Sequence, residues 1–217
     1  HYFFHGNFLF QSGNDSLAIT KFSNYIEVSS YSMQSIVRSL NALSNNGEAR
    51  VGFNWLKTYY LQKHVSSEDL LFLLNQFFYN PKFTSDNRLD ILSLLDLMEV
   101  SGYDQLALND IRYRFFSIIG AAPQLLETLR QKHAISSLDS LQWLQFLELQ
   151  LSFGAPDSVI KFSREALTVT NRTRVHFLSG IAYQFKGDHE SAIASFNSGL
   201  KFLNFRQDST FSSLYLG

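Results

Sequence analysis

The chain contains no cysteine, so disulfide bonds, thiolate metal ligands and cysteine nucleophiles are all excluded. Only 3 of its 217 residues are proline, which suits a long succession of helices and argues against a loop-rich β-sandwich. No apolar run reaches the roughly 18 residues that a membrane-spanning helix needs, so we expect no direct membrane insertion. A chain without cysteine is compatible with a bacterial periplasmic or exported protein, and a cytoplasmic location stays equally open.

The chain also lacks a large net charge. Its 18 basic and 19 acidic residues give a net charge of -1, which does not favour nucleic acid or an anionic membrane as a partner. Hydrophobic residues make up 45% of the chain, and they include 21 Phe and 10 Tyr. A composition this apolar excludes intrinsic disorder and is sufficient for a large core.

The stretch from residue 172 to residue 203 has the clearest internal organisation. It predicts two amphipathic helices joined by a tight turn at residues 186–188. Gly180 and Ala192 are small residues placed where the two helices must approach closely, and Phe196 fills the space beside them. The stretch therefore predicts a closely packed helical hairpin.

The spacing of five residues in this hairpin resembles the tetratricopeptide repeat, a family of helical hairpins with a period of 34 residues. In this stretch the five residues are Gly180, Tyr183, Gly187, Ala192 and Phe196. The opening of the chain has the same spacing, with Leu in place of Tyr, at Gly6, Leu9, Gly13, Ala18 and Phe22. The resemblance implies a right-handed superhelical solenoid in which each helix pair is buried only against its neighbours.

Turn signals recur along the whole chain at positions 13, 47, 81, 120, 154 and 187, so the spacings are 34, 34, 39, 34 and 33 residues. This period predicts an all-α fold with about six helix pairs, at residues 1–30, 31–65, 66–102, 103–136, 137–170 and 171–204, and the start of a further helix at 208–217. We interpret residues 1–217 as a single array, truncated at both ends, from a longer protein. The alternative is an irregular all-α domain with one true repeat near its end.

The third pair fits this pattern least well. Its turn lies at Tyr79–Pro81, and an apolar face at Leu89, Leu92, Leu95 and Met98 predicts one helix after the turn. Asp86 and Asp90 occupy the positions where the other units have small and aromatic residues, and we expect both to be solvated.

Residues that could support catalysis or metal binding are not grouped in the sequence. His1 and His5 are four apart on a predicted helix, but no third ligand accompanies them, so we interpret the pair as a coincidence. No histidine has a serine and a carboxylate at a spacing typical of a catalytic triad, and the glycines fall about one per turn rather than in a phosphate-binding loop. The sequence predicts no enzyme activity, no metal and no cofactor.

Three asparagines, Asn7, Asn41 and Asn75, recur at the same position of successive units, at spacings of 34 and 34 residues. Arg114 occupies this position in the fourth unit. The family resemblance implies that the position faces an inner groove, where a row of amides could hold the backbone of an extended peptide. The alternatives are that three solvated asparagines share this period by accident, or that each amide bonds to a nearby carbonyl of its own helix.

Positions around the asparagines would complete the groove. Apolar side chains there could accept alternate residues of a ligand, and an arginine contributes from the sixth unit. The candidate residues are Phe3, Phe10, Val37, Leu71, Phe78 and Arg174.

The resemblance implies a protein-interaction scaffold that binds an extended peptide or partner segment. The alternative function is a ligand-sensing or regulatory domain of a signalling protein or transcriptional regulator. Since apolar faces of the terminal helices would be open, we also expect self-association through them.

Overall fold

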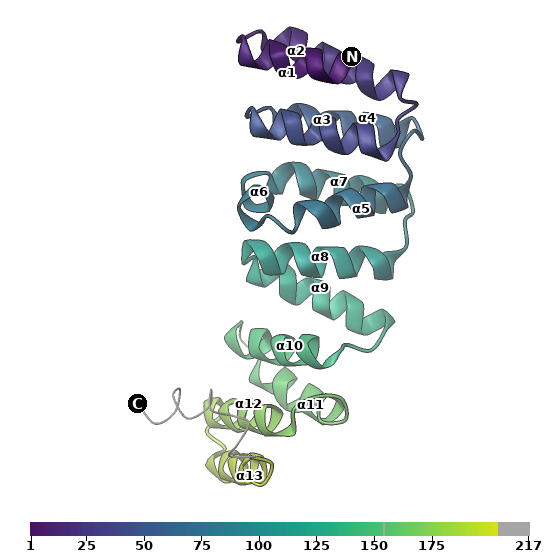
Figure 1. Cartoon of the computed structure of the whole chain (residues 1–217). Helices are drawn as coiled ribbons and strands as arrows, with labels where there is room; N and C mark the ends of the chain where they lie inside the picture. The colour runs from purple at the N-terminus through teal and green to yellow at the C-terminus, as the bar shows by residue number, and fades with distance from the viewer. Residues whose placement is uncertain (154, 204–217) are drawn as a thin grey trace. The chain divides into compact units, whose positions relative to one another are not determined.

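The computed structural model describes residues 1–153 and 155–203, and in these residues it contains thirteen helices and no strand (Figure 1). Within each of two compact units, consecutive helices pack on one another, so the prediction of an all-α helical-repeat fold is confirmed. The chain divides into two compact units, His1–Gly120 and a second unit that begins at Ala121. The boundary lies inside the predicted fourth helix pair, and a single array over both units stays a prediction.

Unit 1 contains eight helices. They are α1 (Tyr2–Gln11), α2 (Asp15–Val28), α3 (Met33–Asn45), α4 (Ala49–Leu61), α5 (Ser67–Phe77), α6 (Pro81–Asp86), α7 (Arg88–Val100) and α8 (Gln105–Ile119). Within this unit α1 packs on α2 and α3 on α4, which are the first two predicted pairs. Helix α2 packs on α3, and α4 packs on α5 and α7, so each pair also buries a face against the next.

Unit 2 contains the other five helices. They are α9 (Ala122–Ile135), α10 (Ser140–Ser152), α11 (Pro156–Ala166), α12 (Arg172–Phe185) and α13 (His189–Leu200). Here α9 packs on α10, α10 on α11, α11 on α12 and α12 on α13. The predicted turn at position 154 and the predicted helix at 208–217 lie outside the described residues.

The third predicted pair is wrong in one respect, because its second helix is two helices, α6 and α7. Asn80 caps α6, accepting a hydrogen bond from the Phe83 amide at 3.0 Å, and Asn87 leaves the helical conformation between α6 and α7. After this break α7 buries Ile91, Leu94, Leu95 and Met98, whereas Leu89 of the predicted apolar face is 72% exposed. The buried face of α7 therefore includes Leu95 and Met98 of the predicted face but not Leu89.

Close contact inside the helical hairpins explains the small residues in the motif. A Cβ atom added to Gly180 of α12 would lie 2.4 Å from Cε1 of Phe196 on α13. In the first hairpin, a Cβ on Gly6 of α1 would lie 2.9 Å from Cζ of Phe22 on α2. Only glycine therefore leaves room for each ring this close to the opposite helix, and the predicted close approach is confirmed.

The turns within hairpins use glycine for a second reason. Gly13, Gly47 and Gly187 have φ angles of 76°, 83° and 77°, in the left-handed region that side chains disfavour. The next helix starts within two residues of each glycine, which produces tight antiparallel pairs.

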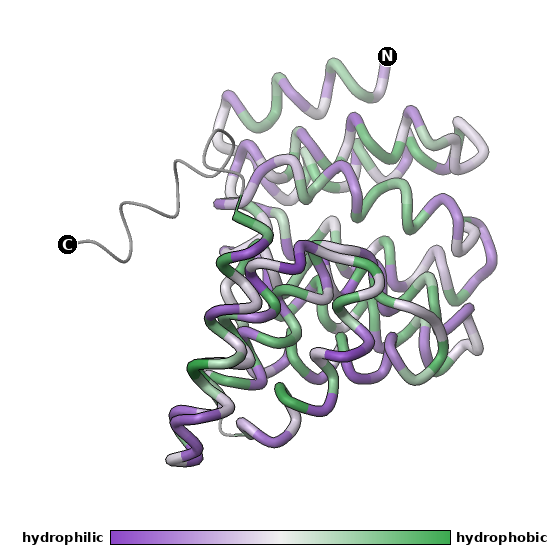
Figure 2. Tube along the Cα trace, turned by 90° about the horizontal axis from the view of Figure 1, so that it is seen from below, coloured by the Kyte–Doolittle hydropathy of each residue, from purple (hydrophilic) through white to green (hydrophobic). Residues whose placement is uncertain are grey.

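Hydrophobic and hydrophilic residues alternate along the helices rather than gathering in long runs (Figure 2). Among the described residues, no helix combines the length and the apolar character that crossing a membrane requires.

Candidate functional site

A cleft separates α3 and α5 in unit 1 and has a volume of about 580 Å³. It is lined by Met33, Gln34, Val37, Arg38, Leu40 and Asn41 from α3 and by Phe72, Leu73, Gln76 and Phe77 from α5. A second cavity of about 150 Å³ continues it toward the C-terminal ends of both helices and shares Leu40, Asn41, Gln76 and Phe77. The two cavities form one trough, which we call the α3–α5 cleft.

The floor of the cleft depends on a glycine of the neighbouring helix. A Cβ atom on Gly52 of α4 would lie 2.5 Å from Cδ2 of Leu40, so Leu40 can lie low against α4 only because residue 52 has no side chain. Leu40 and Leu73 are buried, whereas Phe72 on the opposite wall is 52% exposed. The cleft thus combines a packed apolar floor with an apolar side chain that is open to solvent.

Two amides face the cleft from opposite walls. Asn41 on α3 and Gln76 on α5 are both exposed and line both cavities. Neither side-chain amide has a hydrogen-bond partner among the described residues, and the same holds for Gln34 and for the guanidinium of Arg38. Each amide can both donate and accept, so the cleft has unused hydrogen-bonding capacity for a ligand.

Asn75, the third asparagine of the predicted row, is engaged within the protein. Its amide nitrogen donates to the Leu71 carbonyl at 3.0 Å, and its amide oxygen accepts from the Arg114 guanidinium. Arg114 also lies over the Phe78 ring, 5.7 Å from the ring centroid. Residues 75 and 114 therefore do lie side by side, as the shared position implies, but they bond to each other.

Asn7 and the apolar candidates of the first unit lie around the α1–α2 core. Phe10 is buried and stacks on Phe22 at a centroid distance of 5.6 Å, and the half-buried Phe3 contacts the same ring at 5.6 Å. Asn7 is half-buried and does not line the α3–α5 cleft.

Phe78, the apolar candidate that follows α5, is also buried, and its ring centroid lies 6.1 Å from that of Phe115. Of the predicted contact residues in unit 1, Val37 and Asn41 are the two that line the cleft.

Arg174, the candidate from the sixth predicted unit, lies in unit 2 on α12. Its guanidinium donates to the carboxylate of Glu148 on α10. This pair joins two neighbouring helices across 26 residues of sequence. A role in partner binding stays a prediction for Arg174.

The sequence reasoning missed Arg38, Phe72 and Gln76. Each lies one residue from a position that the period did single out, namely Val37, Leu71 and Asn75. A helix turns by about 100° per residue, so an error of one position moves the expected contact off the cleft. The signal that could have found them is the helical wheel of residues 33–45 and 67–77, because all three lie outside the buried stripe of their helices, although Phe72 is apolar.

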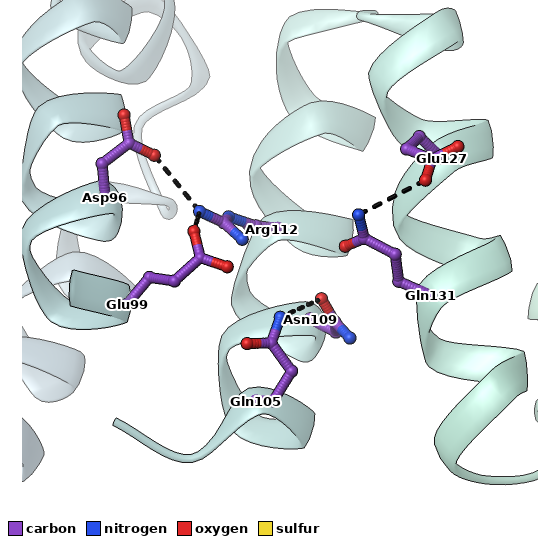
Figure 3. Close-up of polar contacts among 7 residues, drawn as sticks. All are labelled: Asp96, Glu99, Gln105, Asn109, Arg112, Glu127 and Gln131. Atoms are coloured by element: carbon purple, nitrogen blue, oxygen red, sulfur yellow. Dashed lines mark hydrogen bonds and ion pairs between the residues drawn. The ribbon is translucent and has the colours of Figure 1, made fainter. Parts of the chain in front are cut away.

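An ion-pair network joins α7 to α8 (Figure 3). The Arg112 guanidinium donates to Glu99 Oε2 at 2.7 Å and to Asp96 Oδ1 at 3.2 Å. Arg112 is only 12% exposed, and its hydrogen bond lowers the pKa of the Glu99 carboxyl. Asp96 and Glu99 therefore pair with a largely buried cation.

A second cleft, of about 590 Å³, lies in unit 2 at the C-terminal ends of α9 and α11. His133 Nε2 lies 3.4 Å from Glu165 Oε2 at this cleft, and the His133 ring packs edge-on against Trp143 at 4.9 Å. Nδ1 of His133 and Nε1 of Trp143 are buried and have no hydrogen-bond partner among the described residues. Arg164 and Thr168 complete the polar side of this cleft.

Metal-ligand geometry is not found in the described part of the chain, which contains no group of three or more His, Cys, Asp or Glu residues able to hold a metal ion. The rings of His1 and His5 lie 6.2 Å apart, edge to face. The α3–α5 cleft offers side-chain amides, one guanidinium and apolar side chains, a set that suits binding by hydrogen bonds and apolar contacts.

The packing of consecutive helices and the open cleft between two of them define the chain as an α-helical repeat protein. No protein-family model matches the chain, and no curated protein matches it. A solved structure described as "Crystal structure of MamA" is similar to it, with 13% sequence identity, a TM-score of 0.42, and coverage of 90% of this chain and 92% of that chain. At this identity and TM-score the likeness carries no argument about function.

Proposed function

We propose that the protein is an interaction scaffold that captures an extended segment of a partner protein in the α3–α5 cleft. The observation that supports this proposal is the pair of free amides, Asn41 and Gln76, on opposite walls of one trough. An extended segment has backbone N–H and C=O groups that no secondary structure satisfies, and side-chain amides bond to both kinds. Binding through the backbone is tolerant of sequence, which suits a scaffold.

Apolar contacts would supply most of the affinity. Side chains of an extended segment alternate in direction, so those that point into the trough would meet Val37, Phe72 and the Leu40 floor. The lined part of α3 runs from Met33 to Asn45, which at 1.5 Å per residue is about 18 Å. A length of about 18 Å accommodates five or six residues of extended chain.

The test selects ligands from a displayed library of random linear peptides and measures their affinities by fluorescence anisotropy. We expect selected peptides to bind the double variant Asn41→Ala/Gln76→Ala about tenfold more weakly, since two hydrogen bonds of about 0.5–1.5 kcal/mol each are lost. Asn54→Ala, which removes an exposed asparagine of α4 outside the cleft, is the matched control and should bind normally. Equal affinity for the double variant and the wild type would place binding elsewhere and refute the proposal.

The alternative function, sensing of a small ligand, is supported by the cleft in unit 2. Unpartnered buried nitrogens such as those of His133 and Trp143 cost about 1–3 kcal/mol each, and a bound polar molecule could reduce this cost. A metabolite panel screened by thermal shift would test it. Hits that persist unchanged in His133→Ala, or no hits at all, would count against the sensing function.

Self-association is a further part of the proposal. Phe4 and Phe8 form an exposed apolar stripe on α1, 78% and 63% exposed, and Ile193 and Leu200 form another on α13. Exposed apolar faces of this kind favour association between copies. Light scattering at increasing concentration should show oligomers that the variant Phe4→Ser/Phe8→Ser loses, and a wild-type monomer at high concentration would contradict this expectation.

A further inference from the structure

We infer that the segment held in the α3–α5 cleft carries an acidic side chain, internal to the segment, that pairs with Arg38. This inference rests on the proposed function and adds the chemistry of the partner. It follows from the distribution of charge along the trough, from the lack of a hydrogen-bond or ion-pair partner for Arg38 among the described residues, and from the length of the lined surface on both sides of Arg38.

Arg38 is the one charged residue among those that line the two cavities, and no lining residue is acidic. Two other arginines of unit 1 have partners, since Arg112 bonds to Asp96 and Glu99 and Arg114 bonds to Asn75. Arg50 and Arg88 have none among the described residues, but neither lines the cleft. The guanidinium of Arg38 has no ion pair and no hydrogen bond among the described residues. The cleft therefore presents an uncompensated positive charge with five free N–H donors.

The surroundings of Arg38 would strengthen an ion pair formed there. Val37 and the half-exposed Phe72 are apolar, and a bound segment would exclude water from the space between them. A carboxylate suits the planar guanidinium because it can accept two parallel hydrogen bonds. A basic residue at the same place would meet a like charge with no acid nearby in the lining, so the cleft also disfavours basic segments.

The acidic group is expected within the segment and not at its carboxyl end. Met33 and Gln34 extend the lined surface about one turn of α3 beyond Arg38, and Asn41 and Asn45 extend it in the other direction. Because the trough continues on both sides, a bound chain passes Arg38 instead of ending there. A free terminal carboxylate is therefore unnecessary for binding.

One nearby acid limits the preference to a single position. Glu68 lies one turn before Phe72 on α5, is exposed, and does not line the cleft. Its charge would repel a second acidic residue placed toward the N-terminal end of α5. The cleft thus favours one acidic side chain at the level of Arg38 and not a generally acidic segment.

The experiment compares the peptide pools that random linear libraries yield on the wild type and on Arg38→Glu. The wild-type pool should be enriched in Asp or Glu at one position, and the Arg38→Glu pool in Lys or Arg at that position. Arg50→Glu, which reverses an exposed arginine of α4 outside the cleft, is the matched control and should return the wild-type pool. Circular dichroism of each variant confirms that it is folded before selection.

Affinities then separate this inference from the proposed function. Changing the selected acid to its amide should weaken binding about fivefold on the wild type and not at all on Arg38→Gln, while amidation of the peptide carboxyl terminus should change nothing. Identical pools on wild type and Arg38→Glu would overturn the inference, and if Asn41→Ala/Gln76→Ala still weakened binding, the proposed function would stand. Dependence on a free carboxyl terminus would overturn the internal placement, and failure to select any peptide would overturn both.

Discussion

Replacing Gly180 with alanine tests the close packing of α12 on α13. The new Cβ atom would lie 2.4, 2.6 and 2.8 Å from three atoms of the Phe196 ring, whereas carbon atoms in contact are separated by about 3.5–4.0 Å. The ring or the helix must therefore move by about 1 Å. Overpacking of this size costs about 1–3 kcal/mol.

A second effect of the substitution favours the folded state, so the sign of the measured stability change shows which effect is larger. Alanine is a better helix former than glycine by about 1 kcal/mol, and Gly180 lies inside α12 with an ordinary helical φ. We expect the net result to be a loss of about 1–2 kcal/mol in the free energy of unfolding of unit 2. In a domain of this size each kcal/mol lowers Tm by about 4–8 °C.

The double variant removes the clash and should reverse the sign. Leucine at position 196 lacks the distal ring atoms, and its branch can rotate away from α12. In the Phe196→Leu background Gly180→Ala should therefore stabilise unit 2, by up to about 1 kcal/mol from helix propensity alone. The coupling free energy between the two substitutions measures the cost that arises from the contact of the added Cβ with the Phe196 ring.

Urea unfolding followed by tryptophan fluorescence is a suitable assay. The chain has 2 tryptophans, Trp55 in unit 1 and Trp143 in unit 2, so the Trp55→Phe background leaves a reporter buried in α10 of unit 2. Equal destabilisation by Gly180→Ala in both backgrounds would refute the argument, because the cost would then not depend on the ring. Stabilisation in the wild-type background would refute it as well.

Three further predictions concern turns and charges. Arg112→Met should destabilise unit 1 at neutral pH, because it removes the ion pair with Glu99. The pKa of Glu99 is lowered from 4.5 in the folded state. The stabilisation that the ion pair provides is therefore fully present above pH 4.5 and is lost as the pH falls through the lower folded pKa. The stability difference between variant and wild type should therefore narrow in urea titrations as the pH decreases below about 4, and a constant difference would contradict this reasoning. Gly187→Ala should lower the free energy of unfolding by about 1 kcal/mol, and the cause is its φ of 77° alone, since no atom lies within 4 Å of the added Cβ. Gly187→Asn should lower it by less, because asparagine tolerates a positive φ better than alanine. Equal losses for the two variants would contradict the backbone explanation. Lys63→Gly should stabilise unit 1 by about 0.5 kcal/mol, because it relieves a φ of 61° at an exposed residue. Calorimetry should show a raised unfolding midpoint, and a lowered midpoint would show that the lysine side chain contributes.

Much of the local structure could be predicted from the sequence because it depends on residues close together in the chain. The turn at Gly187, the hairpin that it closes and the contact of Gly180 with Phe196 all involve residues within one helical pair. Apolar periodicity and glycine position report directly on such pairs. Helices α1 and α2 and helices α3 and α4 pack as the first two predicted pairs, whereas α8 and α9, predicted as the fourth pair, belong to different units.

The tertiary structure decided which side chains remain free to bind. Asn41 and Asn75 are equivalent by period, yet Asn75 is occupied by Arg114, 39 residues away, whereas Asn41 faces an open cleft. The break at Asn87 and the burial of Arg112 between two acids likewise depend on how neighbouring helices meet. Sequence periodicity specifies the face on which a residue lies, but its hydrogen-bond partner depends on the distance and rotation between helices, and these are set by packing across the whole unit.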